Sequence, residues 1–194
     1  SLPSRGLGDV YKRQSLYGAV KSKTGELLQD SMEYCKGALQ SVSRSFALTI
    51  PLVEENILGP IMVGYLEARI LDTFEDDIGR REISLEERIE AMNMLMEILE
   101  NPNAESTKEK IEILTGSADE MVQNPKYRDL VKNMRSVLAV HSSFDEDTKE
   151  CMVRWLKEMN FGMQKFLKQE VFSFDDLDES VSYTHLRAHE TEEN

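Results

Sequence analysis

A run of acidic side chains from Asp72 to Asp77 is the part of this sequence best suited to chemistry. Asp72 and Asp76 lie four positions apart, so on a helix both carboxylates project from one face. Acids at the C-terminal end of a helix oppose its dipole, and like charges four apart repel each other. A divalent cation would remove both costs, and hard carboxylate oxygens suit magnesium. The alternative is a solvated acidic face, which is common in acidic proteins.

The segment before this run predicts a buried helix with one polar stripe. Most side chains from Ile57 to Phe74 are apolar, which is typical of a helix surrounded by protein. Tyr65, Arg69, Asp72 and Asp76 follow one another at steps of four, three and four, and therefore share a face. This stripe resembles the wall of a polar cavity. A metal-bridged polyphosphate would fit it, with the planar fork of Arg69 gripping phosphate oxygens.

A second polar cluster, Ser43-Arg44-Ser45-Phe46, lies upstream, shortly before Pro51. Two hydroxyls and a guanidinium can hold phosphate oxygens while the aromatic ring borders an apolar chain. The alternative is a helix end at which a serine caps backbone groups and Arg44 faces water.

Together these segments resemble the squalene/phytoene synthase family, the head-to-head prenyl transferases. The resemblance begins at Tyr34-Cys35, continues through Val42–Ala47 and covers Tyr65–Asp77, with a weaker echo at Met159–Phe166 that resembles the glycine-methionine helix beside the family's prenyl pocket. It implies an all-α, isoprenoid-synthase-type helical bundle. It also implies a Mg2+-dependent transferase that condenses two prenyl diphosphates, with farnesyl diphosphate to squalene favoured.

The resemblance assigns roles to particular residues. Asp72 and Asp76 would be metal ligands and catalytic, with Glu75 in support. Arg69 would be both catalytic and diphosphate-binding. The other substrate-binding residues would be Ser43, Arg44 and Tyr65 for diphosphate and Phe46 for the prenyl channel.

Several alternatives stay open at this point. A squalene-forming enzyme would need NADPH, whereas a phytoene synthase using geranylgeranyl diphosphate would need no reductant. A family member that lost catalysis would serve as a scaffold or assembly protein. An unrelated acidic helical module would bind partner helices or calcium without preferring diphosphate.

Both ends of the chain are predicted to be translated sequencing adaptor. One back-translation of 4–14, read on the opposite strand, encodes the ten residues 181–190. We therefore expect 1–14 and 181–194 to be artefact, and 15–180 to be the N-terminal part of a synthase domain. The family's second acidic motif and the tyrosine before it would follow Glu179, where the adaptor begins. The bundle is thus expected to be truncated before that motif, and the chain as written to be inactive although its parent gene encodes an enzyme.

Composition narrows the class of partner. A formal net charge of −13 argues against nucleic acid, which is bound through basic patches. It gives no electrostatic attraction to anionic membranes either, although peripheral membrane association of the full enzyme stays open. The two cysteines, Cys35 and Cys151, are far apart in sequence and fit a reduced, cytoplasmic protein.

Helical periodicity covers most of the remaining chain. We expect helices over 27–39 and 57–78, from a capping box at Ser84 and Glu87 to about residue 100, and over 107–122, 126–140 and 146–170. No alternating strand pattern of useful length is present.

Overall fold

The computed structural model describes residues 23–76 and 83–168, and every regular element in these two ranges is a helix. The elements are α2 (Lys23–Val42), α3 (Arg44–Thr49), the short 3-10 helix η2 (Ile50–Leu52), α4 (Glu55–Asp76), α5 (Leu85–Glu100), α6 (Glu105–Met121), α7 (Pro125–Lys132), α8 (Met134–His141) and α9 (Glu146–Leu167). The all-α prediction is confirmed. Asp77 and the two predicted adaptor segments lie outside the described residues.

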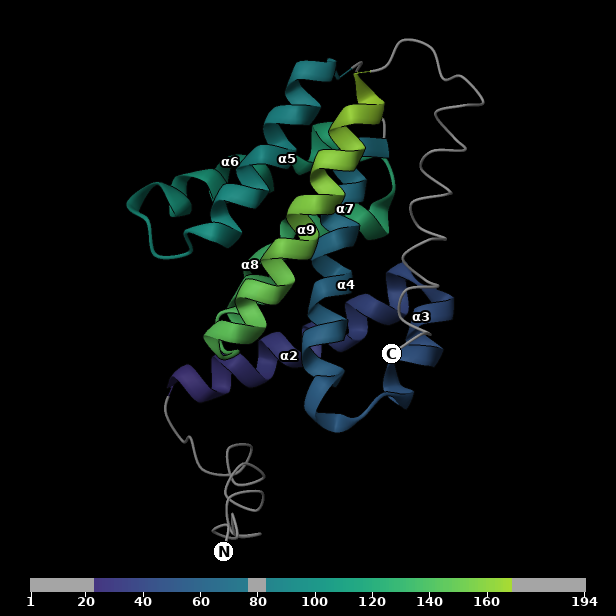
Figure 1. Ribbon diagram of the computed structural model, residues 1–194, viewed down its shortest axis with the longest axis vertical. Helices are drawn as coiled ribbons and strands as arrows, with labels where there is room; N and C mark the ends of the chain where they lie inside the picture. The colour runs from purple at the N-terminus through teal and green to yellow at the C-terminus, as the bar shows by residue number, and fades with distance from the viewer. Residues whose placement is uncertain (1–22, 77–82, 169–194) are drawn as a thin grey trace, which may run out of the picture.

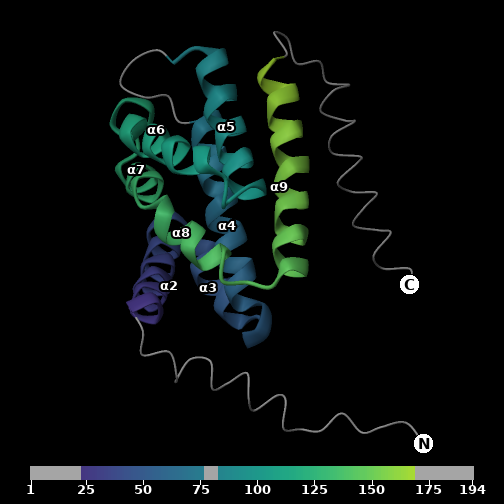
Figure 2. The same cartoon turned by 90° about the vertical axis from the view of Figure 1, so that its left-hand side faces the viewer.

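Helix α4 is the central element of this bundle. It packs against α2, α5, α7, α8 and α9 (Figure 1). Figure 2 shows α9 as an outer helix beside α4 and α5, on the side opposite α6 and α7. One face of α4 buries Val63, Leu66, Ile70 and Leu71, each with at most 1% of its surface exposed. Full burial of such side chains contributes about 1.5–3 kcal/mol each, which fixes the orientation of the helix in the bundle.

Local signals set the helix boundaries much as the sequence predicts. The capping box at the start of α5 is confirmed, because the side chain of Ser84 accepts from the backbone N–H of Glu87 and the Glu87 carboxylate accepts from that of Ser84. Asn124 caps α7 through its side chain, and Pro125 takes the first helical position, where no hydrogen-bond donor is needed.

The prediction of one continuous helix over 126–140 is wrong. The chain forms α7 and α8 instead, separated at Asn133. The side-chain amide of Asn133 donates to the backbone carbonyl and the carboxylate of Asp129. This local bonding competes with the helical ladder, which is why asparagine favours such breaks.

The core contains a buried pair of ionisable side chains on neighbouring helices. Oε1 of Glu67 on α4 lies 2.7 Å from Nδ1 of His141 on α8, and both side chains are at most 3% exposed. The two atoms are close, but neither has a hydrogen-bond partner of good geometry in the described part of the chain. Burial raises the pKa of Glu67, and His141 acts in the opposite direction. Burial also raises the pKa of Cys35 on α2 to about 12, helped by the Glu67 charge.

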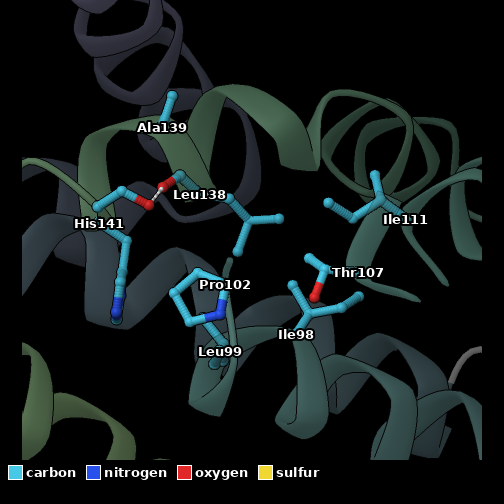
Figure 3. A pocket seen from close by; sticks show the side chains of 9 residues that line it. Ile98, Leu99, Pro102, Thr107, Ile111, Leu138, Ala139 and His141 are labelled. Atoms are coloured by element: carbon cyan, nitrogen blue, oxygen red, sulfur yellow. Dashed lines mark hydrogen bonds between the residues drawn. The ribbon is translucent and has the colours of Figure 1, made fainter. Parts of the chain in front are cut away.

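Two hollows lie beside His141. A small, partly open pocket of about 140 Å³ is bordered by α5, α6, α8 and Pro102, and Figure 3 shows the imidazole of His141 beside it, pointing away from Ala139. A groove of about 500 Å³ lies between the end of α5 and the first half of α9. Neither is lined by a predicted site residue. No helix in 23–76 or 83–168 has the length and apolar character needed to cross a membrane.

Candidate functional site

The predicted polar stripe lies on one face of α4, opposite the side chains that α4 buries. Tyr65, Arg69, Asp72 and Glu75 are half-buried, and Asp76 is exposed in the last turn. The stripe is therefore a partly open wall among the described residues rather than the lining of an enclosed cavity. The helical spacing explains why four polar groups can border a buried helix without entering its core.

Arg69 connects the members of this stripe. Its Nη2 donates to the Tyr65 hydroxyl at 3.1 Å, and its Nη1 donates to Oδ2 of Asp72. Its Nε is buried and has no hydrogen-bond partner in the described part of the chain. Because a buried N–H without a partner costs free energy, this donor is suited to a ligand oxygen.

Two aromatic rings hold the same guanidinium. The carbon at its centre lies 5.7 Å from the ring centroid of Tyr65 and 5.4 Å from that of Tyr127, both within the range of a cation–π contact. Tyr127 comes from α7 and is not among the residues predicted from sequence. A single tyrosine far from either motif carries no signal that could have identified it.

The second predicted cluster meets the stripe through its aromatic residue. The rings of Phe46 and Tyr65 lie 4.7 Å apart, centroid to centroid, and are tilted by 40°. Ser43 caps α3, because its Oγ accepts from the backbone N–H of Phe46 at 3.2 Å. Arg44 begins α3 and is exposed. The helix-end alternative is confirmed, because the serine caps α3 and Arg44 is exposed. The segment also borders the stripe through Phe46, and its role in holding phosphate stays a prediction.

The acidic end of the stripe concentrates negative charge. Burial, with smaller contributions from the Asp76 and Asp72 charges, raises the pKa of Glu75 to about 7, and Arg88 opposes this rise. Burial also raises the pKa of Asp72, against the pull of Arg69, and Asp76 adds to the rise. Carboxylates this close together repel one another, which raises their pKa values. The same carboxylates are suitable ligands for a hard divalent cation.

The described residues do not complete a metal site. Within 23–76 and 83–168, no three acidic, histidine or cysteine side chains converge closely enough to hold an ion. The predicted ligands Asp72, Glu75 and Asp76 fit magnesium in their chemistry, and their role in a metal site stays a prediction.

The same face of α4 becomes apolar toward its N-terminal end, a feature that the sequence analysis missed. Ile57 and Ile61 continue the stripe at steps of four before Tyr65, and they are 43% and 39% exposed. Phe46, whose ring contacts that of Tyr65, is 48% exposed. A single helical face therefore runs from apolar to acidic, and the periodicity that identified its polar half could have identified the rest.

The segment 159–166 lies on the second half of α9. Met159 and Met163 pack against the core, and Gln164 donates to side-chain oxygens of Asn93 on α5 and Asn160, at 2.7 and 3.1 Å. A side-chain carbon placed on Gly162 would meet no atom within 4 Å. This part of α9 is thus anchored to α5 on one side and open at the glycine. Its role beside a prenyl pocket stays a prediction.

Comparison with known proteins agrees with this arrangement. The squalene/phytoene synthase family matches residues 39–188, a range that includes both motifs. Lycopaoctaene synthase of Botryococcus braunii is 30% identical over 167 residues, which cover 86% of this chain and 32% of that protein. Squalene synthase 1 of Arabidopsis thaliana is 28% identical over 179 residues (90% and 39%), and squalene synthase of Bos taurus is 26% identical over 156 (80% and 33%).

The fold is also similar to that of solved structures. A complex of TcSQS with a ligand superposes with a TM-score of 0.61 at 26% identity, over 76% of this chain and 39% of that one. The chain spans roughly a third of the length of the relatives that it matches. The ordered pair of motifs, the helical fold and the sequence match agree, and the chain belongs to the squalene/phytoene synthase family.

Proposed function

We propose that this chain contributes the first acidic wall of a magnesium-dependent prenyl transferase that joins two prenyl diphosphates head to head. The observation that carries the proposal is the graded face of α4. Asp72 and Asp76 lie at its acidic end, Arg69 and Tyr65 in the middle, and Ile61 and Ile57 at its apolar end. A ligand with an ionic head and a long apolar tail is complementary to such a face.

Each side chain has a task in this proposal. Arg69 offers phosphate oxygens its unpartnered Nε. The hydroxyl oxygens of Tyr65 and Ser43 each accept a hydrogen bond, so their O–H groups can still donate to phosphate. Arg44 is exposed at the start of α3, next to Ser43, and would add a positive charge for the diphosphate. Phe46 borders the prenyl chain. A magnesium ion held by Asp72, Asp76 and Glu75 would supply the positive charge that stabilises a departing diphosphate.

The preferred substrate in this proposal is farnesyl diphosphate, with squalene as product and NADPH as reductant. Relatives named squalene synthase support it. The relative named lycopaoctaene synthase shows that the family is not confined to one product, so a phytoene-type product from geranylgeranyl diphosphate stays the second candidate.

Replacing Asp72 by asparagine is expected to weaken magnesium-dependent binding of a non-hydrolysable farnesyl diphosphate analogue at least tenfold. The change keeps the size of the side chain and removes the charge that would hold the metal, and tenfold corresponds to about 1.4 kcal/mol. Isothermal titration calorimetry with and without magnesium measures it. Asp147→Asn, an exposed acid in the first turn of α9, is the matched control.

Inorganic diphosphate, titrated in parallel, separates the head from the tail. If inorganic diphosphate binds the wild-type chain more weakly than the analogue does, the result would support a role for Ile61, Ile57 and Phe46 in holding the prenyl group. An analogue that binds equally well without magnesium, or to Asp72→Asn, would contradict the proposal.

We expect the chain by itself to convert no farnesyl diphosphate to product. The reason is that its described residues supply one side of a metal site and no three converging ligands. Radiolabelled farnesyl diphosphate with magnesium, with and without NADPH, tests this. Product formation above the Asp72→Asn background would show that the remaining ligands are present in the chain.

One observation favours a second candidate, a protein of this fold without catalysis. A relative of 26% identity is named inactive squalene synthase 2 of Arabidopsis thaliana. Such a protein would have no need for magnesium-dependent binding, so the calorimetric experiment also separates the two functions.

A further inference from the structure

We infer that Tyr127 is a positioning residue for Arg69, and so for the diphosphate of the substrate. The inference rests on the proposed function for the identity of the ligand, but the contact itself does not. Tyr127 lies on α7, more than fifty positions after Arg69, and its ring centroid is 5.4 Å from the centre of the guanidinium. Together with Tyr65 at 5.7 Å, it gives the cation two aromatic neighbours from two different helices.

Helix α7 is well placed to hold a ring in a fixed position. Leu130 and Val131 are completely buried, so the helix is anchored in the core. A side chain of α2 also holds α7 in place. The Tyr34 hydroxyl donates to the Asp129 carboxylate at 3.0 Å and lies 3.2 Å from the backbone carbonyl of Asp129. The position of Tyr127 is therefore set by contacts that do not involve Arg69.

The chemistry of the contact explains what Tyr127 adds. A cation–π contact holds the guanidinium through its charge and uses none of its N–H donors. The Nε of Arg69 thus stays available while the plane of the group is restrained. When a metal draws Asp72 away from Arg69, or a diphosphate takes the place of Asp72, the hydrogen bond to Asp72 is lost, but both ring contacts can remain. Tyr127 is in this way suited to keep Arg69 in place at the moment of binding.

The binding experiment compares Tyr127→Phe with Tyr127→Leu. Phenylalanine keeps the aromatic face and should bind the farnesyl diphosphate analogue within about twofold of the wild-type chain. Leucine removes it and should weaken binding roughly five- to thirtyfold, the range of a partly desolvated cation–π contact. Trp155→Leu is the matched control, because Trp155 makes the same kind of contact with Arg154, at 5.3 Å, on α9. It should leave binding unchanged.

A measurement without ligand separates this inference from the proposed function. In a 1H–15N NMR spectrum, the Nε–H signal of Arg69, assigned by its loss in Arg69→Lys, should be shifted by the rings and exchange slowly with water. Tyr127→Phe should preserve the shift, and Tyr127→Leu should move the signal toward that of an exposed arginine.

The outcomes are distinct. If the wild-type chain binds no analogue but the Arg69 signal behaves as expected, the proposed function fails and the positioning of Arg69 by Tyr127 stands. If the wild-type signal shows no ring shift, or Tyr127→Leu leaves both signal and affinity unchanged, the inference is overturned. Because Tyr65 also shifts this signal, a nuclear Overhauser effect between the Tyr127 ring protons and the Arg69 Nε–H in the wild-type chain decides the matter even if Tyr127→Leu does not fold: its presence supports the inference and its absence overturns it.

Discussion

Replacing His141 by leucine is expected to lower the free energy of unfolding by about 3 kcal/mol at pH 7, which removes a large part of the stability of a typical domain. The change leaves the carboxyl of Glu67 completely buried without its partner 2.7 Å away. That carboxyl must then stay charged in the core or take up a proton. Protonating a group with an unfolded-state pKa of about 4.3 costs at most about 3.7 kcal/mol at pH 7, since each pH unit corresponds to 1.36 kcal/mol.

The effect should depend on pH in a defined direction. Burial raises the pKa of Glu67 in the folded protein, and His141 lowers it, so loss of His141 raises it further. The folded variant then binds more protons than its unfolded chain above about pH 4. The free energy of unfolding of the variant is therefore highest below that pH, and it falls as the pH rises through the folded-state pKa of Glu67. The difference from the wild-type chain should therefore widen from pH 5 to pH 7.

Urea denaturation followed by circular dichroism at pH 5, 6 and 7 measures this difference. The double variant Glu67→Met/His141→Leu is the control, because it removes both polar groups and should recover stability and lose the extra pH dependence. A His141→Leu variant as stable as the wild-type chain at all three pH values would show that the pair does not stabilise the core.

Leu66→Ala should cost about 2–5 kcal/mol of unfolding free energy, whereas Ile61→Ala on the same helix should cost less than about 1 kcal/mol. Leu66 is completely buried on the core face of α4, so its removal leaves a cavity as well as losing apolar burial. Ile61 lies on the graded face and is 39% exposed. The comparison measures which face of α4 the bundle covers.

Urea denaturation at a single pH gives both values, and equal m-values would indicate that the unfolding transition has kept its character. Similar costs at the two positions would mean that the face with Ile61 is covered by protein, which would contradict its proposed use as a surface for a prenyl chain. The analogue-binding assay on Ile61→Ala then tests that use separately.

The sequence could predict those features that depend on neighbours along one helix. The spacing of Tyr65, Arg69, Asp72 and Asp76 is enough to place them together, because helical geometry is local and regular. The capping box at Ser84 and Glu87 is predictable for the same reason. The all-α class follows from many such segments.

Contacts between distant segments could not be predicted in this way. Tyr127 meets Arg69, and His141 meets Glu67, only because α7 and α8 pack against α4. Neither residue belongs to a motif, and a buried glutamate within an apolar helix gives no indication of which residue will face it. The break at Asn133 was missed because both halves of 126–140 share one helical periodicity, and the side-chain bonds to Asp129 decide the matter.

The hydrogen bond between Arg69 and Asp72 gives the proposed site a thermodynamic property of its own. In the unliganded chain, the arginine serves as the counter-ion of a carboxylate that a metal would use. A cation that binds Asp72 would replace Arg69 as its counter-ion, and the guanidinium, held in place by its aromatic neighbours, would become available for an anion. At the proposed site, binding of the metal would lower the free-energy cost of binding diphosphate, and the reverse, so we expect the two ligands to bind cooperatively. Because linkage is reciprocal, each must raise the affinity for the other by the same factor.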